Sequence, residues 1–219
     1  LFGGLIIVAA SVRAVIWDFG GVLITPITDA IDDVASWHGT SMVDMLDVLM
    51  GPREQSTADH PWHRAERGEL AIAEMQVAVE PWARAAGISL RGDEYARLLR
   101  GDFDVRDAVI DRIGRLREEG YITAMLTNSF REFRPTLEER INTSVFDVVV
   151  DSSEVGYRKP EPQIYEIATE MVGVDAAEVL YFDDFAANIN GAAAVGWQTV
   201  HVTGEHHIIS DLERILAGS

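Results

Sequence analysis

The sequence predicts an α/β fold: a Rossmann-like parallel sheet covered by helices on both faces, with a helical-bundle cap inserted after the first strand. Short apolar runs rich in Val, Ile and aromatic residues recur along the chain, and helix-like stretches separate them in its second half. This alternation is typical of a parallel sheet buried on both faces. Between Thr25 and about Asp102 the strand-like runs vanish and only helical periodicities remain.

The apolar runs mark the expected strands, and the periodic stretches between them mark the expected helices. The strands are expected at Val12 to Trp17, Ile122 to Leu126, Val145 to Val150, Val179 to Phe182 and Thr199 to Val202. The core helices are expected at Asp107 to Glu119, Pro162 to Val172 and Asn188 to Val195. Gly120 and Gly196 follow the first and the last of these helices, where glycine commonly ends a helix.

The inserted segment divides the chain into a core, residues 1–24 and 103–219, and a cap, residues 25–102. Its candidate helices are Ile27 to Met50, Trp62 to Arg67, Ala71 to Ala86 and Asp93 to Arg100, which would form a small bundle. Because the insertion follows the first strand directly, we expect the cap to lie above the carboxyl edge of the sheet.

Composition excludes several classes of function. The 219 residues are 47% apolar, which is enough for a substantial core, and 18 basic residues face 36 acidic ones for a net charge of -18. That charge disfavours binding to a nucleic-acid backbone. Without cysteine there is no disulfide framework and no thiolate-bound zinc, so a cytoplasmic location is permitted and is the one we expect.

The first ten residues, LFGGLIIVAA, are apolar but fall short of the roughly 20 needed to cross a bilayer, and they lack a basic region. We interpret them as an extra strand or a consequence of start-site choice, and we expect no membrane association.

Polar residues follow the predicted strands at the edge where parallel sheets bind ligands. The first strand ends at Asp18, the second at Thr127, Asn128 and Ser129, and the fourth at Asp183 and Asp184. A single aspartate after a strand is more often a cap or turn former. An aspartate, a hydroxyl and a carboxylate pair on one edge together favour a site for metal-assisted attack on an anion.

These strand ends resemble the motifs of the haloacid dehalogenase (HAD) superfamily. VIWDFGGVL resembles its first motif, LTNS the second, the lysine of YRKPEPQIY the third and YFDDFAAN the fourth, in the family's order. The resemblance covers about Val12 to Gly204, and the cap is its least specific part. The stretch from Val149 to Asn188 is similar in particular to the amino-terminal phosphatase domain of soluble epoxide hydrolases.

The resemblance implies a nucleophile and a metal site. Asp18 would attack phosphorus and form an aspartyl-phosphate, which divides one difficult displacement into two easier ones. Asp18, Asp184 and the backbone carbonyl of Gly20 would hold Mg²⁺, an ion that prefers oxygen ligands. Asp183 would lie behind these ligands and support them.

The resemblance also implies a phosphate-binding set. Thr127, through its hydroxyl, and Asn128, through its backbone or amide N–H, would bind the phosphoryl oxygens. Lys159 would neutralise charge on the nucleophile and the transferring group. For Asn128 and Asn188, a role in the site and a local capping role stay open.

Gly20 departs from the family's phosphatase pattern, in which a second aspartate two residues after the nucleophile serves as general acid and base. General acid–base catalysis is typically worth about 10² to 10⁴ in rate. Its loss leaves three outcomes: a preference for good leaving groups such as anomeric sugar phosphates or acyl phosphates, supply of the proton by another group or water, or loss of catalysis.

The cap residues that could choose the substrate are its polar and aromatic side chains. The candidates are Trp37, His38, His60, Trp62 and His63, with the densest cluster at His60 to Arg64. His206 and His207 are adjacent and point in different directions, so we interpret them as a surface loop rather than a metal site.

The resemblance thus implies a Mg²⁺-dependent phosphatase acting on a small organic phosphate monoester, with that ester as its partner and a homodimer left open. One alternative is a metal-independent 2-haloacid dehalogenase, which also lacks the second aspartate. The pair Asp183 and Asp184 argues against it, because adjacent carboxylates near an anionic substrate would be repulsive without a cation. The other alternative is a phosphate-binding regulatory protein, which Gly20 favours and the retained Asp18, Thr127, Lys159 and Asp184 disfavour.

Overall fold

A five-stranded parallel sheet forms the centre of the computed structural model, which describes residues 11–26, 28–51, 60–92, 94, 95, 97, 103–204 and 207–218. The strand order is β3-β2-β1-β4-β5, and every pair of neighbours is parallel. The strands are β1 (Ala14–Trp17), β2 (Ile122–Thr127), β3 (Val148–Asp151), β4 (Val179–Asp183) and β5 (Gln198–His201). The predicted α/β class is therefore confirmed.

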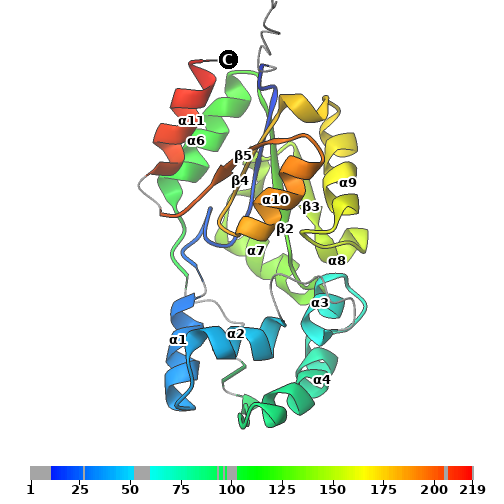
Figure 1. Cartoon of the computed structure of the whole chain (residues 1–219). Coiled ribbons are helices and arrows are strands. Elements are labelled where there is room, and N and C mark those ends of the chain that lie inside the picture. Colours follow the sequence, from blue (N-terminus) through cyan, green and yellow to red (C-terminus); the bar gives the residue numbers. More distant parts are fainter. Residues whose placement is uncertain are drawn as a thin grey trace, which may run out of the picture.

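Helices cover both faces of the sheet (Figure 1). Alternate side chains of a strand point to opposite faces, so Val15 and Trp17 of β1 join one core cluster while Ala14 and Ile16 join the other. On the face of Trp17 pack α6 (Asp107–Glu118) and α11 (Ile208–Leu216). On the face of Ile16 packs α9 (Pro162–Val172), and α10 (Ala186–Ala194) also lies there. Two short helices, α7 (Arg134–Arg140) and α8 (Ser152–Val155), follow β2 and β3.

The predicted strand from Val145 to Val150 is wrong at its start. Residues Thr143–Val145 form a 3₁₀ turn, and β3 begins only at Val148. Asn142 explains the difference, because its side-chain oxygen accepts a hydrogen bond from the backbone N–H of Ser144 and so favours a turn. The predicted helix from Asn188 likewise begins earlier, at Ala186.

Between β1 and α6 the described residues form helices and no strand. The helices are α1 (Thr28–Trp37), α2 (Met42–Met50), α3 (Pro61–Glu66) and α4 (Ile72–Ala85). The single helix predicted from Ile27 to Met50 is wrong, because Gly39 adopts φ +65° and Ser41 caps a new helix by accepting from the N–H of Asp44. Most of the helix predicted from Asp93 to Arg100 lies outside the described residues.

The two ends of this helical segment lie side by side. Ile24 and Val105 form an isolated antiparallel bridge, the N–H of Thr25 donates to the carbonyl of Asp104, and that of Arg106 donates to Leu23. In Figure 1, α1 to α4 lie beyond the carboxyl ends of the strands. The division into a core and a cap at residues 25–102 stays a prediction that this arrangement supports. Within the described part of the chain, no helix is both long and apolar enough to span a bilayer.

His60 is buried and begins α3, where its Nδ1 accepts a hydrogen bond from the backbone N–H of Trp62. Burial and the neighbouring His63 lower the pKa of His60 from 6.5 to about 4. The unfolded chain therefore takes up this proton first as the pH falls. The resulting contribution to the free energy of unfolding is complete above about pH 6.5 and is lost towards pH 4.

We predict that His60→Asn, which keeps a capping side chain but removes the titration, reduces the loss of stability on acidification. The difference should be about 1–2 kcal/mol between about pH 7 and pH 5. Urea unfolding of both proteins at the two pH values measures it. Parallel stability changes in the two proteins would contradict the assignment.

Candidate active site

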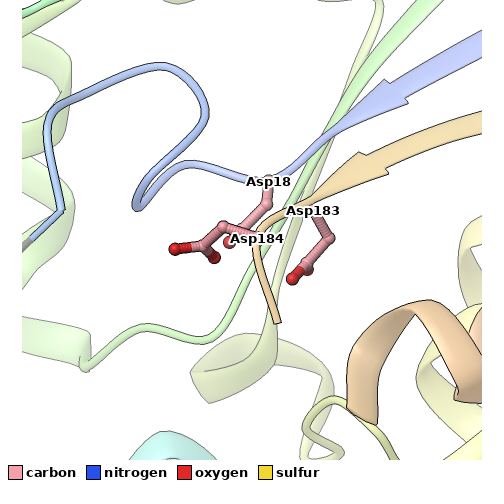
Figure 2. A group of neighbouring side chains, drawn as sticks. All are labelled: Asp18, Asp183 and Asp184. Carbon is pink, nitrogen blue, oxygen red and sulfur yellow. The ribbon is translucent and has the colours of Figure 1, made fainter. Parts of the chain in front are cut away.

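Three aspartates gather at the carboxyl edge of the sheet, where β1 and β4 end side by side (Figure 2). Asp18 follows β1, and its backbone N–H donates to the carbonyl of Phe182 at 2.9 Å, which holds the two strand ends together. Asp183 ends β4 and Asp184 begins the following loop. Each aspartate offers one carboxylate oxygen, and these oxygens lie within 4.8 Å of one another.

The loop after β1 brings its backbone close to Asp184. Gly21 adopts φ +70°, and a Cβ at this position would stand 2.1 Å from Oδ2 of Asp184. A side chain here would both strain the backbone and push the carboxylate away. Gly20 differs, because a Cβ built on it would meet no atom within 4 Å. The position of the absent second aspartate is therefore open space.

Lys159 is buried against the aspartates, with 1% of its surface exposed. Its Nζ lies 2.6 Å from Oδ1 of Asp18, 2.8 Å from Oδ2 of Asp183 and 3.0 Å from the hydroxyl of Tyr181. Desolvation alone would lower the pKa of Lys159, but Asp18 and Asp183 outweigh it and raise that pKa. The lysine is therefore a fixed cation beside the predicted nucleophile.

The two carboxylates of the pair at the end of β4 differ in their partners. Asp183 receives hydrogen bonds from Lys159, Tyr181, the side-chain amide of Asn188 and the backbone N–H of Phe185. Asp184 carries a buried oxygen, Oδ1, that has no hydrogen-bond partner among the described residues. Asp183 is thus held as a support, whereas Asp184 has an oxygen to offer to a ligand.

The charges fit a bound cation. The three carboxylates and the ammonium of Lys159 together carry a formal charge of -2 when all are ionised. Burial raises the pKa of Asp18 despite Lys159, and burial with Asp183 raises the pKa of Asp184 to about 6. Ionised carboxylate oxygens are suitable ligands for a divalent ion. Such an ion would compensate the negative charge of the three carboxylates and provide a partner for the unpaired Oδ1 of Asp184.

The predicted phosphate-binding residues lie beside the same space. Thr127 ends β2 and, with Asn128, lines the cavity that Asp18 enters. The amide of Asn128 is engaged with the backbone of Lys159: Nδ2 donates to its carbonyl at 3.0 Å and Oδ1 accepts from its N–H at 2.8 Å. Two N–H donors were predicted for Asn128. The side-chain amide is engaged with the backbone of Lys159, so the backbone N–H is the donor that stays a prediction for phosphate binding. Asn188 similarly orients Asp183.

A cavity of about 220 Å³ lies between the strand ends and the helical segment. Trp62 and His63 line it, as predicted for cap residues that face the site. Trp37 and His38 do not line it: Trp37 is 56% exposed, and His38 pairs with Glu94 at 3.1 Å. These two candidates therefore do not face the site: the α1 residues that pack inward are Ile31, Val34 and Ala35, and His38 follows the end of that helix.

The remaining candidates of the His60 to Arg64 cluster and the pair His206 and His207 lie away from the cavity or outside the described residues. His60 is buried at the start of α3 and does not line the cavity, so its predicted placement is wrong. Arg64 pairs with Glu69 at 3.1 Å on the surface. His207 is exposed, and His206 lies outside the described residues.

Sequence reasoning missed the partners that hold the site together. Tyr181 stands two positions before Asp183 on β4, so the period of two in strands places both side chains on one face and could have identified it. Glu66 and Arg158 form a buried ion pair, and Glu66 also accepts from Nε1 of Trp62 at 2.9 Å. No local pattern signals a pair separated by 92 positions.

The fold and the site define an α/β protein with a carboxylate-rich site at the carboxyl edge of its sheet. A profile for hydrolases, described as haloacid dehalogenase-like hydrolase, matches residues 12–196. The chain therefore belongs to the haloacid dehalogenase-like hydrolase family, which confirms the resemblance carried by its motifs.

Several relatives extend beyond this chain. It is 28% identical to mouse acyl-CoA dehydrogenase family member 10 and 23% identical to rat bifunctional epoxide hydrolase 2. Each match covers 94% of this chain, which spans only 19% and 39% of those two proteins. Two relatives match over most of their length. The sesquiterpene phosphatase astK of Aspergillus oryzae is 25% identical (93% of this chain, 96% of that one). The (S)-2-haloacid dehalogenase 1 of a Pseudomonas strain is 24% identical (87% and 84%).

Solved structures share the fold. A predicted HAD-like family hydrolase from Porphyromonas gingivalis superposes with a TM-score of 0.69 at 23% identity, covering 94% of this chain and 98% of that one. A HAD family enzyme from Bacteroides thetaiotaomicron, in complex with magnesium and inorganic phosphate, gives 0.65 at 20% identity, covering 91% and 99%.

We predict that Gly21→Ala impairs Mg²⁺ binding, whereas the neighbouring Gly20→Ala does not. The first change places a methyl group against Asp184 and adds about 1 kcal/mol of backbone strain, while the second enters open space. Titration calorimetry with Mg²⁺ and thermal unfolding of both variants measure the effects. Equal Mg²⁺ affinities in the two variants would show that Asp184 is not a ligand.

Proposed function

We propose that this protein is a Mg²⁺-dependent phosphatase of small organic phosphate monoesters, with Asp18 as the nucleophile. One buried site combines two features that support this proposal. Lys159 forms an ion pair with Asp18, and Oδ1 of Asp184 has no hydrogen-bond partner among the described residues. A phosphatase needs a fixed cation for the transferring group and an open metal position beside its nucleophile.

The reaction would proceed in two displacements. A carboxylate oxygen of Asp18 attacks phosphorus, the ester P–O bond breaks, and the organic group leaves as an alkoxide that takes up a proton. Water then attacks the aspartyl-phosphate, the acyl-phosphate P–O bond breaks, and phosphate leaves with the carboxylate of Asp18 restored. Covalent catalysis of this kind replaces one difficult step by two easier ones.

Asp18, Asp184 and the carbonyl of Gly20 would hold the Mg²⁺. When bound, the ion supplies charge neutralisation and orientation for the phosphoryl oxygens. Lys159 compensates charge on Asp18 and on the transferring group, and its two other partners, Asp183 and Tyr181, keep its ammonium in place. Thr127 and the backbone N–H of Asn128 would bind the remaining phosphoryl oxygens.

Gly20 leaves the leaving-group oxygen without a protein acid at the usual position. The space beside it is open, so water can reach the oxygen from this side. The enzyme should therefore be most effective with leaving groups that need little protonation.

The dehalogenase alternative draws on the haloacid dehalogenase among the relatives. The geometry disfavours it, because the buried, unpaired Oδ1 of Asp184 would face a carboxylate substrate with no cation between them. A regulatory role without turnover is the third candidate, and Gly20 is the observation that favours it. A cytoplasmic location and a homodimer remain predictions.

The proposal predicts Mg²⁺-dependent hydrolysis of phosphate esters that is steepest for acidic leaving groups. A panel of esters with graded leaving-group pKa is measured with Mg²⁺ and with EDTA, using Asp18→Asn as the blank. Turnover should require Mg²⁺ and disappear in the blank. If no ester is hydrolysed while inorganic phosphate still binds, the regulatory role replaces the proposal; turnover of a 2-haloacid in EDTA would establish the dehalogenase.

We predict that Gly20→Asp restores the missing acid, since its side chain enters open space. It should raise kcat/KM for alkyl phosphates by at least about 10-fold and change aryl phosphates much less, because a phenolate leaves without a proton. Gly20→Asn, of the same size but unable to donate from a carboxyl group, is the matched control. Equal effects of the two variants would contradict the missing-acid argument.

A further inference from the structure

We propose that the organic part of the substrate is a small aryl group, and not a sugar or another polyhydroxylated group. This inference rests on the proposed phosphatase function and adds the class of alcohol that the site accepts. The cavity beside Asp18 carries it, through its lining, its size and the state of its polar groups.

The lining beyond the phosphoryl end is mostly apolar and aromatic, with His63, Glu66 and Arg158 as its charged or titratable members, and comes from both parts of the chain. The helical segment and its connections contribute aliphatic side chains and Trp62, and the core contributes phenylalanines and Leu137. These residues are Ile24, Ile31, Leu46, Met50, Trp62, Phe103, Phe130, Phe133, Leu137 and Phe185. Apolar surface of this kind stabilises a bound apolar group by removing it from water.

The cavity is small as well as apolar. A cavity of about 150 Å³ can hold a benzene molecule. The volume of about 220 Å³ found here therefore admits a phosphoryl group together with an organic group of about the size of one ring.

Two charged side chains of the cavity lining, Glu66 and Arg158, are engaged with each other. Glu66 accepts from Arg158 through Oε2 and from Trp62 through Oε1. Each carboxylate oxygen therefore already accepts one hydrogen bond, and the positive charge of Arg158 is compensated. This pair therefore presents no uncompensated charge to a substrate hydroxyl, and a hydroxyl placed against the apolar lining would stay unpaired.

The apolar lining distinguishes between the classes of good leaving group that the absence of an acid at Gly20 favours. Anomeric sugar phosphates have a good leaving group, but their several hydroxyls would meet phenylalanine and leucine side chains. Aryl phosphates combine a leaving group that needs no acid with a surface that the cavity can bury. The lining and the missing acid are independent observations, and they favour the same class.

The first test compares phenyl phosphate with 4-hydroxyphenyl phosphate on the unmodified protein with Mg²⁺. The two phenols are similar in acidity and size, so chemistry at phosphorus is matched and only the added hydroxyl differs. A hydrophobic pocket discriminates against such a hydroxyl by up to about 10²-fold, so we expect kcat/KM to fall by about 10- to 100-fold, and further for glucose 1-phosphate. Equal kcat/KM for phenyl and 4-hydroxyphenyl phosphate, or preference for glucose 1-phosphate, would overturn the inference.

Acetyl phosphate separates this outcome from failure of the proposed function, because it is reactive and has almost no organic group to bind. Hydrolysis of acetyl phosphate without discrimination among the larger esters would leave the phosphatase standing and remove the apolar class. If acetyl phosphate and every ester are inert, both the phosphatase and the inference that rests on it fall.

The second test locates the apolar site with two variants of α2. Met50 is half-buried and lines the cavity, whereas Val43 on the same helix is 52% exposed and lies outside it. Met50→Gln should lower the ratio of kcat/KM for phenyl phosphate to that for acetyl phosphate by about 10-fold, and Val43→Gln should leave it unchanged. An unchanged ratio in Met50→Gln, with normal thermal unfolding, would place the organic group elsewhere.

Discussion

The contact of the Lys159 ammonium with Asp18 and Asp183 is the constraint on which the rest of the site depends. A buried lysine is tolerated only when its charge is compensated, and two carboxylates within 2.8 Å provide this. Those carboxylates reach it because β1 and β4 are neighbours that end at the same edge. Tyr181 and Asn188 each donate a hydrogen bond to Asp183, and Tyr181 also accepts one from the ammonium of Lys159.

Features of the fold and the site could be predicted from the sequence where they depend on residues close together in the chain. The strands and the residues that end them depend on local patterns, so the sequence alone located the parallel sheet and placed Asp18, Thr127 and Asp183 at its edge. The pairing of Glu66 with Arg158 joins residues 92 positions apart and leaves no local trace. The side of α1 that packs inward could not be predicted for the same reason, because tertiary packing determines that Trp37 is exposed.

The helical segment is tied by ion pairs to the loop that carries Lys159. Glu66 pairs with Arg158, and Arg67 pairs with Glu161 at 2.7 Å, so the ion pairs from α3 bracket Lys159 on both sides. Gly68 permits this approach, because a Cβ there would stand 2.3 Å from the carbonyl of Ser153. The residues that shape the cavity for the organic group therefore also restrain the segment that carries the lysine.

In the proposed phosphatase reaction, the open space at Gly20 and the apolar lining act on the same step. Without an acid beside the leaving oxygen, the barrier depends on how well the departing group carries negative charge by itself. The apolar lining offers a localised alkoxide no hydrogen-bond donor, whereas a phenolate spreads its charge over a ring that the lining can contact. A site without this acid would discriminate among alcohols by their acidity as well as by their shape.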